Sequence, residues 1–181
     1  PTGWTFLLPE LWVCGLIGAV LLLDLRWKGE RHSTLGLLAA LGLLPIFPIL
    51  AFQSGAGAQS LFGGIYRVDH FSLFFKGIFL TTALLVIGMA RELQRTLERG
   101  HGEFYLLILT ATLGMFSVAS SADFLLLFVS LELITISFYV MVSYLKTNLR
   151  SLEAGLKYLI LGSLASGFFL YGIAFLYGST G

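Results

Sequence analysis

Charged residues are scarce in this chain of 181 residues. Only 12% of them are charged and 57% are hydrophobic, whereas a soluble domain has about 25% charged and roughly 45 to 50% apolar residues. The apolar residues extend along the whole length, which predicts that most of the chain lies in the hydrocarbon core of a membrane. The net charge is +1 and no dense basic block occurs, so a nucleic-acid-binding surface is excluded.

Cysteine is nearly absent as well. The single one, Cys14, lies in an apolar run and is expected to be a small buried hydrophobic residue. One cysteine cannot form an intrachain disulfide, a CxxC redox pair or a cysteine-ligated cluster. There is no dense cluster of metal ligands either, so no metal or cofactor is assigned to this chain.

Long apolar segments are what the sequence does contain. Each approaches the length of about 20 residues that crosses a bilayer as a helix, and none alternates in polarity like a barrel strand. The chain is therefore predicted to be an all-α, polytopic membrane protein with six transmembrane helices. They are expected at 6–25, 35–52, 71–90, 104–119, 124–145 and 154–176. Pro45 and Pro48 interrupt the second helix, where we expect a kink.

Lysine and arginine are distributed unevenly among the loops. The first, third and fifth loops contain Arg26, Lys28, Arg31, Arg91, Arg95, Arg99, Lys146 and Arg150, and the second and fourth contain only Arg67. Because cytoplasmic loops carry the excess of positive charge, both ends of the chain are predicted on the outer side of the membrane. The first helix is not a signal peptide, since its basic residues follow it.

Glu132 is the most informative charge inside a predicted helix. It lies about nine residues into the fifth one, roughly 13 Å from the outer end, where a carboxyl group is costly unless it faces water or a partner. Polar side chains share its face of the helix: Ser121, Thr135, Tyr139, Ser143 and Lys146. This polar stripe is typical of a hydrated path. The alternative is a neutral structural acid, hydrogen-bonded between helices.

Lys157 lies about one turn into the sixth predicted helix. Glu153 precedes it by four residues, so Lys157 either forms an interfacial ion pair with Glu153 or hands on a proton within the protein. Gly155, Gly162 and Ser166 form a small-residue face almost opposite Lys157, which indicates close helix packing.

Other charges are expected near the membrane surface. Lys76 lies five residues into the third helix, within reach of the outer surface, and is assigned no role. Glu10 and Asp24 lie near the two ends of the first helix and are interpreted as interfacial. An acid and a base inside the membrane, without metal ligands, favour proton transfer over hydrolysis or redox catalysis.

Five segments in order carry a resemblance to a known family. They are RVDHFSLFF, GEFYLLILTATLGM, LELITISFYVMVSY, RSLEAGLKYLILGSLASG and YGIAFLYGSTG. Together they resemble subunit N of respiratory NADH-quinone oxidoreductase, complex I, over essentially the whole chain. The resemblance implies an antiporter-like, proton-translocating subunit of an NADH:quinone oxidoreductase, without a redox centre of its own.

The resemblance also implies roles for individual residues and partners. Glu132 and Lys157 would be proton-transfer residues of one half-channel, with Thr135, Tyr139 and Ser143 as polar lining. The lysine expected to act with Glu132 would lie beyond Gly181. Other subunits of the complex would bind NADH, flavin, iron–sulfur clusters and quinone, and antiporter-like and small membrane subunits would be neighbours.

Length is where the chain departs from this family. Family members are more than twice as long and are expected to have fourteen helices, with three leading helices before two inverted repeats. Residues 1–103 would be the leading helices and 104–181 the first three helices of an incomplete repeat. The chain begins at Pro1 without methionine, so we expect a fragment or a processed product. The type of quinone and the source membrane stay open between bacterial plasma, organellar inner and thylakoid membranes.

Two other functions stay open. A subunit of a multi-subunit sodium/proton antiporter would share this architecture and the same type of glutamate and lysine. A structural scaffold that bridges neighbouring subunits would need neither residue for proton flow.

Overall fold

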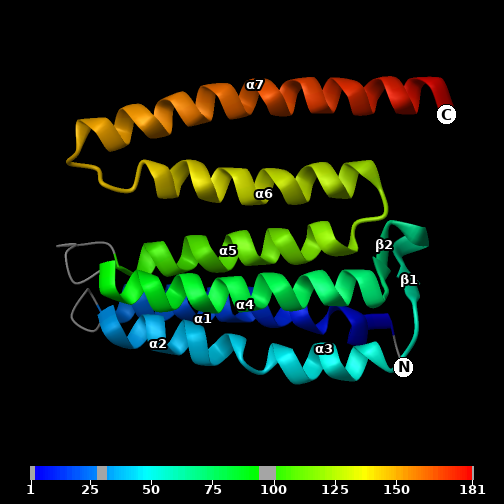
Figure 1. Ribbon diagram of the computed structural model, residues 1–181, viewed down its shortest axis with the longest axis horizontal. Coiled ribbons are helices and arrows are strands. Elements are labelled where there is room, and N and C mark those ends of the chain that lie inside the picture. The colour runs from blue at the N-terminus through cyan, green and yellow to red at the C-terminus, as the bar shows by residue number, and fades with distance from the viewer. Residues whose placement is uncertain (1–2, 28–31, 94–100, 181) are drawn as a thin grey trace.

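A computed structural model describes residues 3–27, 32–93 and 101–180 (Figure 1). A short 3-10 helix, η1 (Gly3–Leu7), leads into α1 (Leu8–Trp27). The other helices are α2 (His32–Leu43), α3 (Ile46–Ser54), α4 (His70–Leu93), α5 (His101–Ser120), α6 (Phe124–Val142) and α7 (Leu149–Thr180). Within these residues six helical segments are long and apolar enough to cross a membrane, which confirms the six predicted helices.

The buried core lies among the first helices. Figure 1 shows α6 and α7 as two successive layers beside the bundle of α1 to α5. Val13, Leu80, Ile87 and Leu109 are fully enclosed in that bundle. Gly114 lets α5 and α6 approach closely, because a Cβ there would lie 3.0 Å from the carbonyl oxygen of Ser130. The first five helices thus form a packed platform for α6 and α7.

The second membrane segment is broken rather than continuous. Helix α2 ends at Leu43 and α3 begins at Ile46, with Pro45 as its N-cap at φ −61°. Proline lacks the N–H that would continue the helix, and its ring clashes with the preceding turn. Pro48 lies in the first turn of α3, where backbone N–H groups have no intrahelical acceptor, so it is tolerated. The expected kink is confirmed.

The last two helices differ in length from the prediction. Helix α6 stops at Val142, three residues early, and α7 has 32 residues and begins at Leu149 instead of 154. The side chain of Asn148 accepts a hydrogen bond of 3.0 Å from the backbone N–H of Arg150. This cap starts the helix within a polar stretch that hydropathy alone leaves out.

A small β-hairpin, which the sequence analysis did not predict, covers one end of the bundle. Strand β1 (Gln59–Leu61) pairs antiparallel with β2 (Tyr66–Val68) through the 3-10 turn η2 (Phe62–Gly64). Gly63 and Gly64 adopt φ of 69° and 103° in that turn, which glycine tolerates best. The N–H of Ala122 donates to the carbonyl of Ile65 at 2.9 Å. The hairpin is therefore fastened to the connection between α5 and α6.

Two further expectations concern single residues. Cys14 is exposed on the surface of the bundle, so its predicted burial is wrong; the adjacent Val13, and not Cys14, faces the core. Lys28, Arg31, Arg95 and Arg99, on which much of the predicted orientation rests, lie outside the described residues.

Candidate functional site

Glu132 lies at the interface between α6 and α7. It is eight residues from the start of α6, roughly 12 Å along the helix axis. Its carboxylate is half-buried and accepts a short hydrogen bond from the hydroxyl of Ser166 on α7. A serine hydroxyl donates to an ionised carboxylate and can rotate to accept from a protonated one. The pair is therefore satisfied in both protonation states.

Part of the predicted polar stripe faces the same neighbour. The Tyr139 hydroxyl is buried against Gly162, where any Cβ would overlap it. The ring of Tyr139 also meets that of Tyr158 edge to face at 4.9 Å. Ser143 packs against Gly155, whose Cβ position lies 3.1 Å from the Ser143 Cα. The small residues of α7 thus create the room for the polar side chains of α6.

Other members of the stripe point elsewhere. Thr135 donates to the backbone carbonyl of Glu132 at 3.1 Å, so its hydroxyl is used within α6. Ser121 bonds the carbonyl of Val118 in the turn before α6. Lys146 lies in the following loop, 3.5 Å from Glu103. The stripe is therefore shorter than predicted, because its two ends fall outside α6.

Lys157 is not joined to Glu132. Its ammonium group lies 2.5 Å from Glu153, and both side chains are more than 60% exposed, which confirms the ion pair that the sequence analysis gave as one alternative. Lys157 and Ser166 are nine residues apart on α7, so they lie on opposite faces of that helix. Glu132 therefore contacts one side of α7, and the side chain of Lys157 projects from the opposite side.

A buried ion pair lies where the sequence predicted a surface lysine. The Lys76 ammonium is fully enclosed, 2.7 Å from the Glu10 carboxylate and 3.0 Å from the Tyr66 hydroxyl. The expectation that Lys76 reaches the surface is wrong, because α1 and β2 cover it and supply its partners. A usable signal existed: Glu10 and Lys76 have opposite charges at similar depths in two predicted helices that run in the same direction.

The surroundings of this pair are closed to solvent. Burial, and then the nearby charge of Glu10, raise the pKa of Tyr66 far above its usual range. Tyr66 therefore stays protonated and can act as a hydrogen-bond donor. We define Glu10, Tyr66 and Lys76 as the buried charge cluster.

The connections at the ends of α6 also contain titratable groups. Asp123 caps α6, accepting from the N–H of Leu125 at 2.8 Å, and accepts from the Tyr177 hydroxyl at 2.6 Å. The bond from Tyr177, with the backbone bond from Leu125, lowers the pKa of Asp123. Burial raises the pKa of Tyr144 in the α6–α7 connection to about 12. In the described ranges no three His, Cys, Asp or Glu side chains gather as a metal site.

Comparison with known proteins shows which class of membrane protein the α6–α7 region resembles. Residues 121–181 match the family model for the transmembrane region of NADH:quinone oxidoreductase and Mrp antiporters. These residues include α6, α7 and the Glu132–Ser166 pair. The class is thus that of antiporter-like membrane subunits.

Relatives along the whole chain narrow the class to one subunit. The chain is 38% identical to NADH-quinone oxidoreductase subunit N 2 of Chloroherpeton thalassium, over 99% of this chain and 36% of that protein. It is also 38% identical to the chloroplastic NAD(P)H-quinone oxidoreductase subunit 2 of Nephroselmis olivacea, over 97% of this chain and 36% of the relative.

A solved structure agrees in fold. A chain of respiratory complex I from Thermus thermophilus with bound aureothin superposes with a TM-score of 0.79 at 32% identity, covering 95% of this chain and 37% of that one. Over nearly its whole length the chain is therefore similar to part of NADH-quinone oxidoreductase subunit N. It spans about a third of the length of the curated relatives it matches.

Proposed function

We propose that this chain works within a proton-translocating membrane subunit of NADH-quinone oxidoreductase. Electron transfer from NADH to quinone in other subunits, through their flavin and iron–sulfur clusters, would drive the proton movement. The observation that carries the proposal is the Glu132–Ser166 pair, a mid-membrane carboxyl group whose partner serves both its charged and its neutral form.

The side chains around this pair take different parts in the proposal. Glu132 holds the proton, and Ser166 reorients as the proton arrives and leaves. Tyr139 and Ser143 extend the polar lining along α6, while the hydroxyl of Thr135 donates to the backbone carbonyl of Glu132 and would have to turn from it to join the lining. Lys157, on the opposite face of α7, serves a separate transfer step, so a further group has to connect it to Glu132.

The environment follows from the same proposal. The subunit would lie in a bacterial plasma membrane or in an organellar inner or thylakoid membrane, with both ends of this chain on the outer side. Its neighbours would be other antiporter-like and small membrane subunits of the complex. Residues 1–103 would form the leading helices and 104–181 would open the first repeat. The bacterial and chloroplastic relatives support the plasma-membrane and the thylakoid alternatives.

A sodium/proton antiporter subunit is the second candidate. The matching family model covers both NADH:quinone oxidoreductase and Mrp antiporters, so residues 121–181 alone favour neither. Sodium-dependent proton flux in vesicles without NADH would support the antiporter.

The test uses inverted membrane vesicles that contain the whole subunit. We expect Glu132→Gln to lower the number of protons moved per NADH oxidised, because glutamine cannot exchange a proton. Ser166→Ala should give a smaller loss, since the carboxyl group keeps its own proton site but loses its partner.

The matched control is Glu103→Gln, which changes an exposed carboxylate in the first turn of α5. It should leave the proton-to-electron ratio unchanged. If Glu132→Gln pumps as the control does in fully assembled complexes, the protonation role of Glu132 is rejected. Loss of assembly with an unchanged ratio in the assembled remainder would indicate the scaffold instead.

A further inference from the structure

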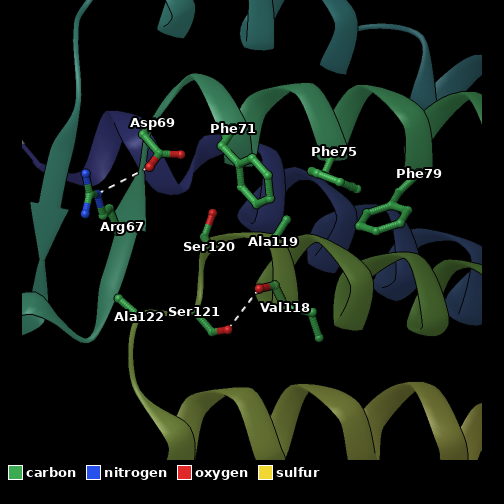
Figure 2. Close-up of a pocket in the computed structure, with 10 residues that line it drawn as sticks. All are labelled: Arg67, Asp69, Phe71, Phe75, Phe79, Val118, Ala119, Ser120, Ser121 and Ala122. Atoms are coloured by element: carbon green, nitrogen blue, oxygen red, sulfur yellow. Dashed lines mark hydrogen bonds and ion pairs between the residues drawn. The ribbon is translucent and has the colours of Figure 1, made fainter.

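A groove of about 490 Å³ opens between α4 and the end of α5, beside the hairpin (Figure 2). The residues that line it belong neither to the interface around Glu132 nor to the buried charge cluster. One end of the groove is polar and the rest is apolar. This polarity gradient gives a basis for choosing its occupant.

The apolar wall comes from one face of α4. Phe71, Phe75 and Phe79 follow one another every four residues, with ring centroids 4.7 Å and then 6.0 Å apart. They extend roughly 12 Å along the helix. Figure 2 shows them facing Val118 and Ala119 of α5, whose small side chains leave the space open.

The polar end has both signs of charge. The guanidinium Nε of Arg67 lies 3.3 Å from Asp69 Oδ2, and their side chains are 61% and 28% exposed. Asp69 Oδ1 also accepts the N–H of Ser72 at 2.8 Å and so caps α4. The pair therefore lies at the point where the membrane helix begins.

We propose that this groove binds one phospholipid with an aminoethyl phosphate headgroup, phosphatidylethanolamine. The phosphate would meet Arg67, the ammonium would meet Asp69, and one acyl chain would lie along the three phenylalanines. An anionic headgroup without an amine satisfies Arg67 only and faces the Asp69 charge. A choline headgroup has no N–H to donate to Asp69.

The dimensions favour an acyl chain over a protein helix. Helices α4 and α5 pack directly against each other, and the axes of packed helices lie about 8 to 10 Å apart. A further helix with side chains is about 10 to 12 Å wide and cannot enter between them. A single extended hydrocarbon chain can.

The experiment places a photo-crosslinking residue in the groove. Phe75 is replaced by p-benzoylphenylalanine, and in a separate variant so is Phe74, which lies on the same helix, is 64% exposed and does not line the groove. The protein is reconstituted in vesicles with equal amounts of phosphatidylethanolamine, phosphatidylglycerol and phosphatidylcholine. After illumination, mass spectrometry identifies each adduct.

We expect the adducts at position 75 to be enriched in phosphatidylethanolamine by up to about fivefold, which is the selectivity that an exposed charge pair can provide. Adducts at position 74 should reflect the vesicle composition. Adding Arg67→Gln should remove the enrichment at 75, and Ala119→Leu, which fills the groove, should reduce the yield of lipid adducts there. Equal lipid composition at both positions, or an adduct with a protein segment at 75, overturns the proposal.

Discussion

Replacing Lys76 with methionine removes one member of the buried charge cluster while keeping most of the side-chain volume. The ammonium group is fully enclosed and lies 2.7 Å from a Glu10 carboxylate whose side chain is only 10% exposed. Removing it leaves a negative charge without a counter-charge in a nearly dry environment, at a cost of about 3 to 5 kcal/mol. We therefore expect Lys76→Met to lower the free energy of unfolding by that amount.

The partner substitution separates lost pairing from lost packing. In the double variant Glu10→Gln/Lys76→Met no charge remains, and replacing a whole buried ion pair by neutral groups is often close to neutral in stability. We expect a loss of about 1 to 2 kcal/mol, which arises from polar atoms left without partners. The double variant should thus be more stable than Lys76→Met alone.

The assay is reversible unfolding in mixed detergent micelles, followed by circular dichroism, for the wild type, both single variants and the double variant. Lys146→Met is the matched control, because its ion pair with Glu103 is 76% and 56% exposed and is worth less than about 1 kcal/mol. If Lys76→Met costs no more than this control, or if the double variant is less stable than both single ones, the reasoning is refuted.

Two further predictions concern the contact between α6 and α7. Gly162→Val should lower the free energy of unfolding by about 1 to 3 kcal/mol, because the valine side chain would overlap the Tyr139 hydroxyl. The same unfolding assay measures this loss. The control is Gly167→Val, because Gly167 is exposed and has open space around it. Because the folded-state pKa of Asp123 is lowered, its cap is fully present above about pH 4, the ordinary aspartate value, and is lost as pH falls through the folded pKa. Protection of the α6 N-terminus against hydrogen exchange, measured relative to the intrinsic exchange rate at each pH, should fall on acidification in wild type but show no such step in Asp123→Asn. An identical step in both would contradict the assignment.

The membrane helices follow from local sequence patterns. Apolar length predicts each of them, and Pro45 predicts the break between α2 and α3, because both effects depend on neighbouring residues only. The longer α7 does not follow from hydropathy, since its first turn is polar and begins at the Asn148 cap. The sequence patterns do not predict the hairpin either, because its strands are only three residues long.

The candidate site was only partly predictable. The helical period places Glu132, Tyr139 and Ser143 on one face, and the small residues of α7 indicate where a neighbour approaches. Which helix that neighbour is, and that Ser166 donates to Glu132, depend on tertiary packing, which the helical period does not reveal. Lys76 shows the limit clearly: its partner Glu10 lies 66 positions earlier, and similar depth makes the two residues possible partners without showing that their helices pack side by side.

Hydrogen bonds join α6 and α7 at both ends and in the middle. Tyr177 donates to Asp123 at one end, Ser166 donates to Glu132 near the centre, and Ser151 donates to the carbonyl of Val142 at 2.8 Å at the other end. Two antiparallel rods held at three points cannot slide or splay without breaking at least one bond. Under the proposed function, protonation of Glu132 first requires the Ser166 hydroxyl to rotate, and any displacement of α6 relative to α7 would cost at least one of these hydrogen bonds.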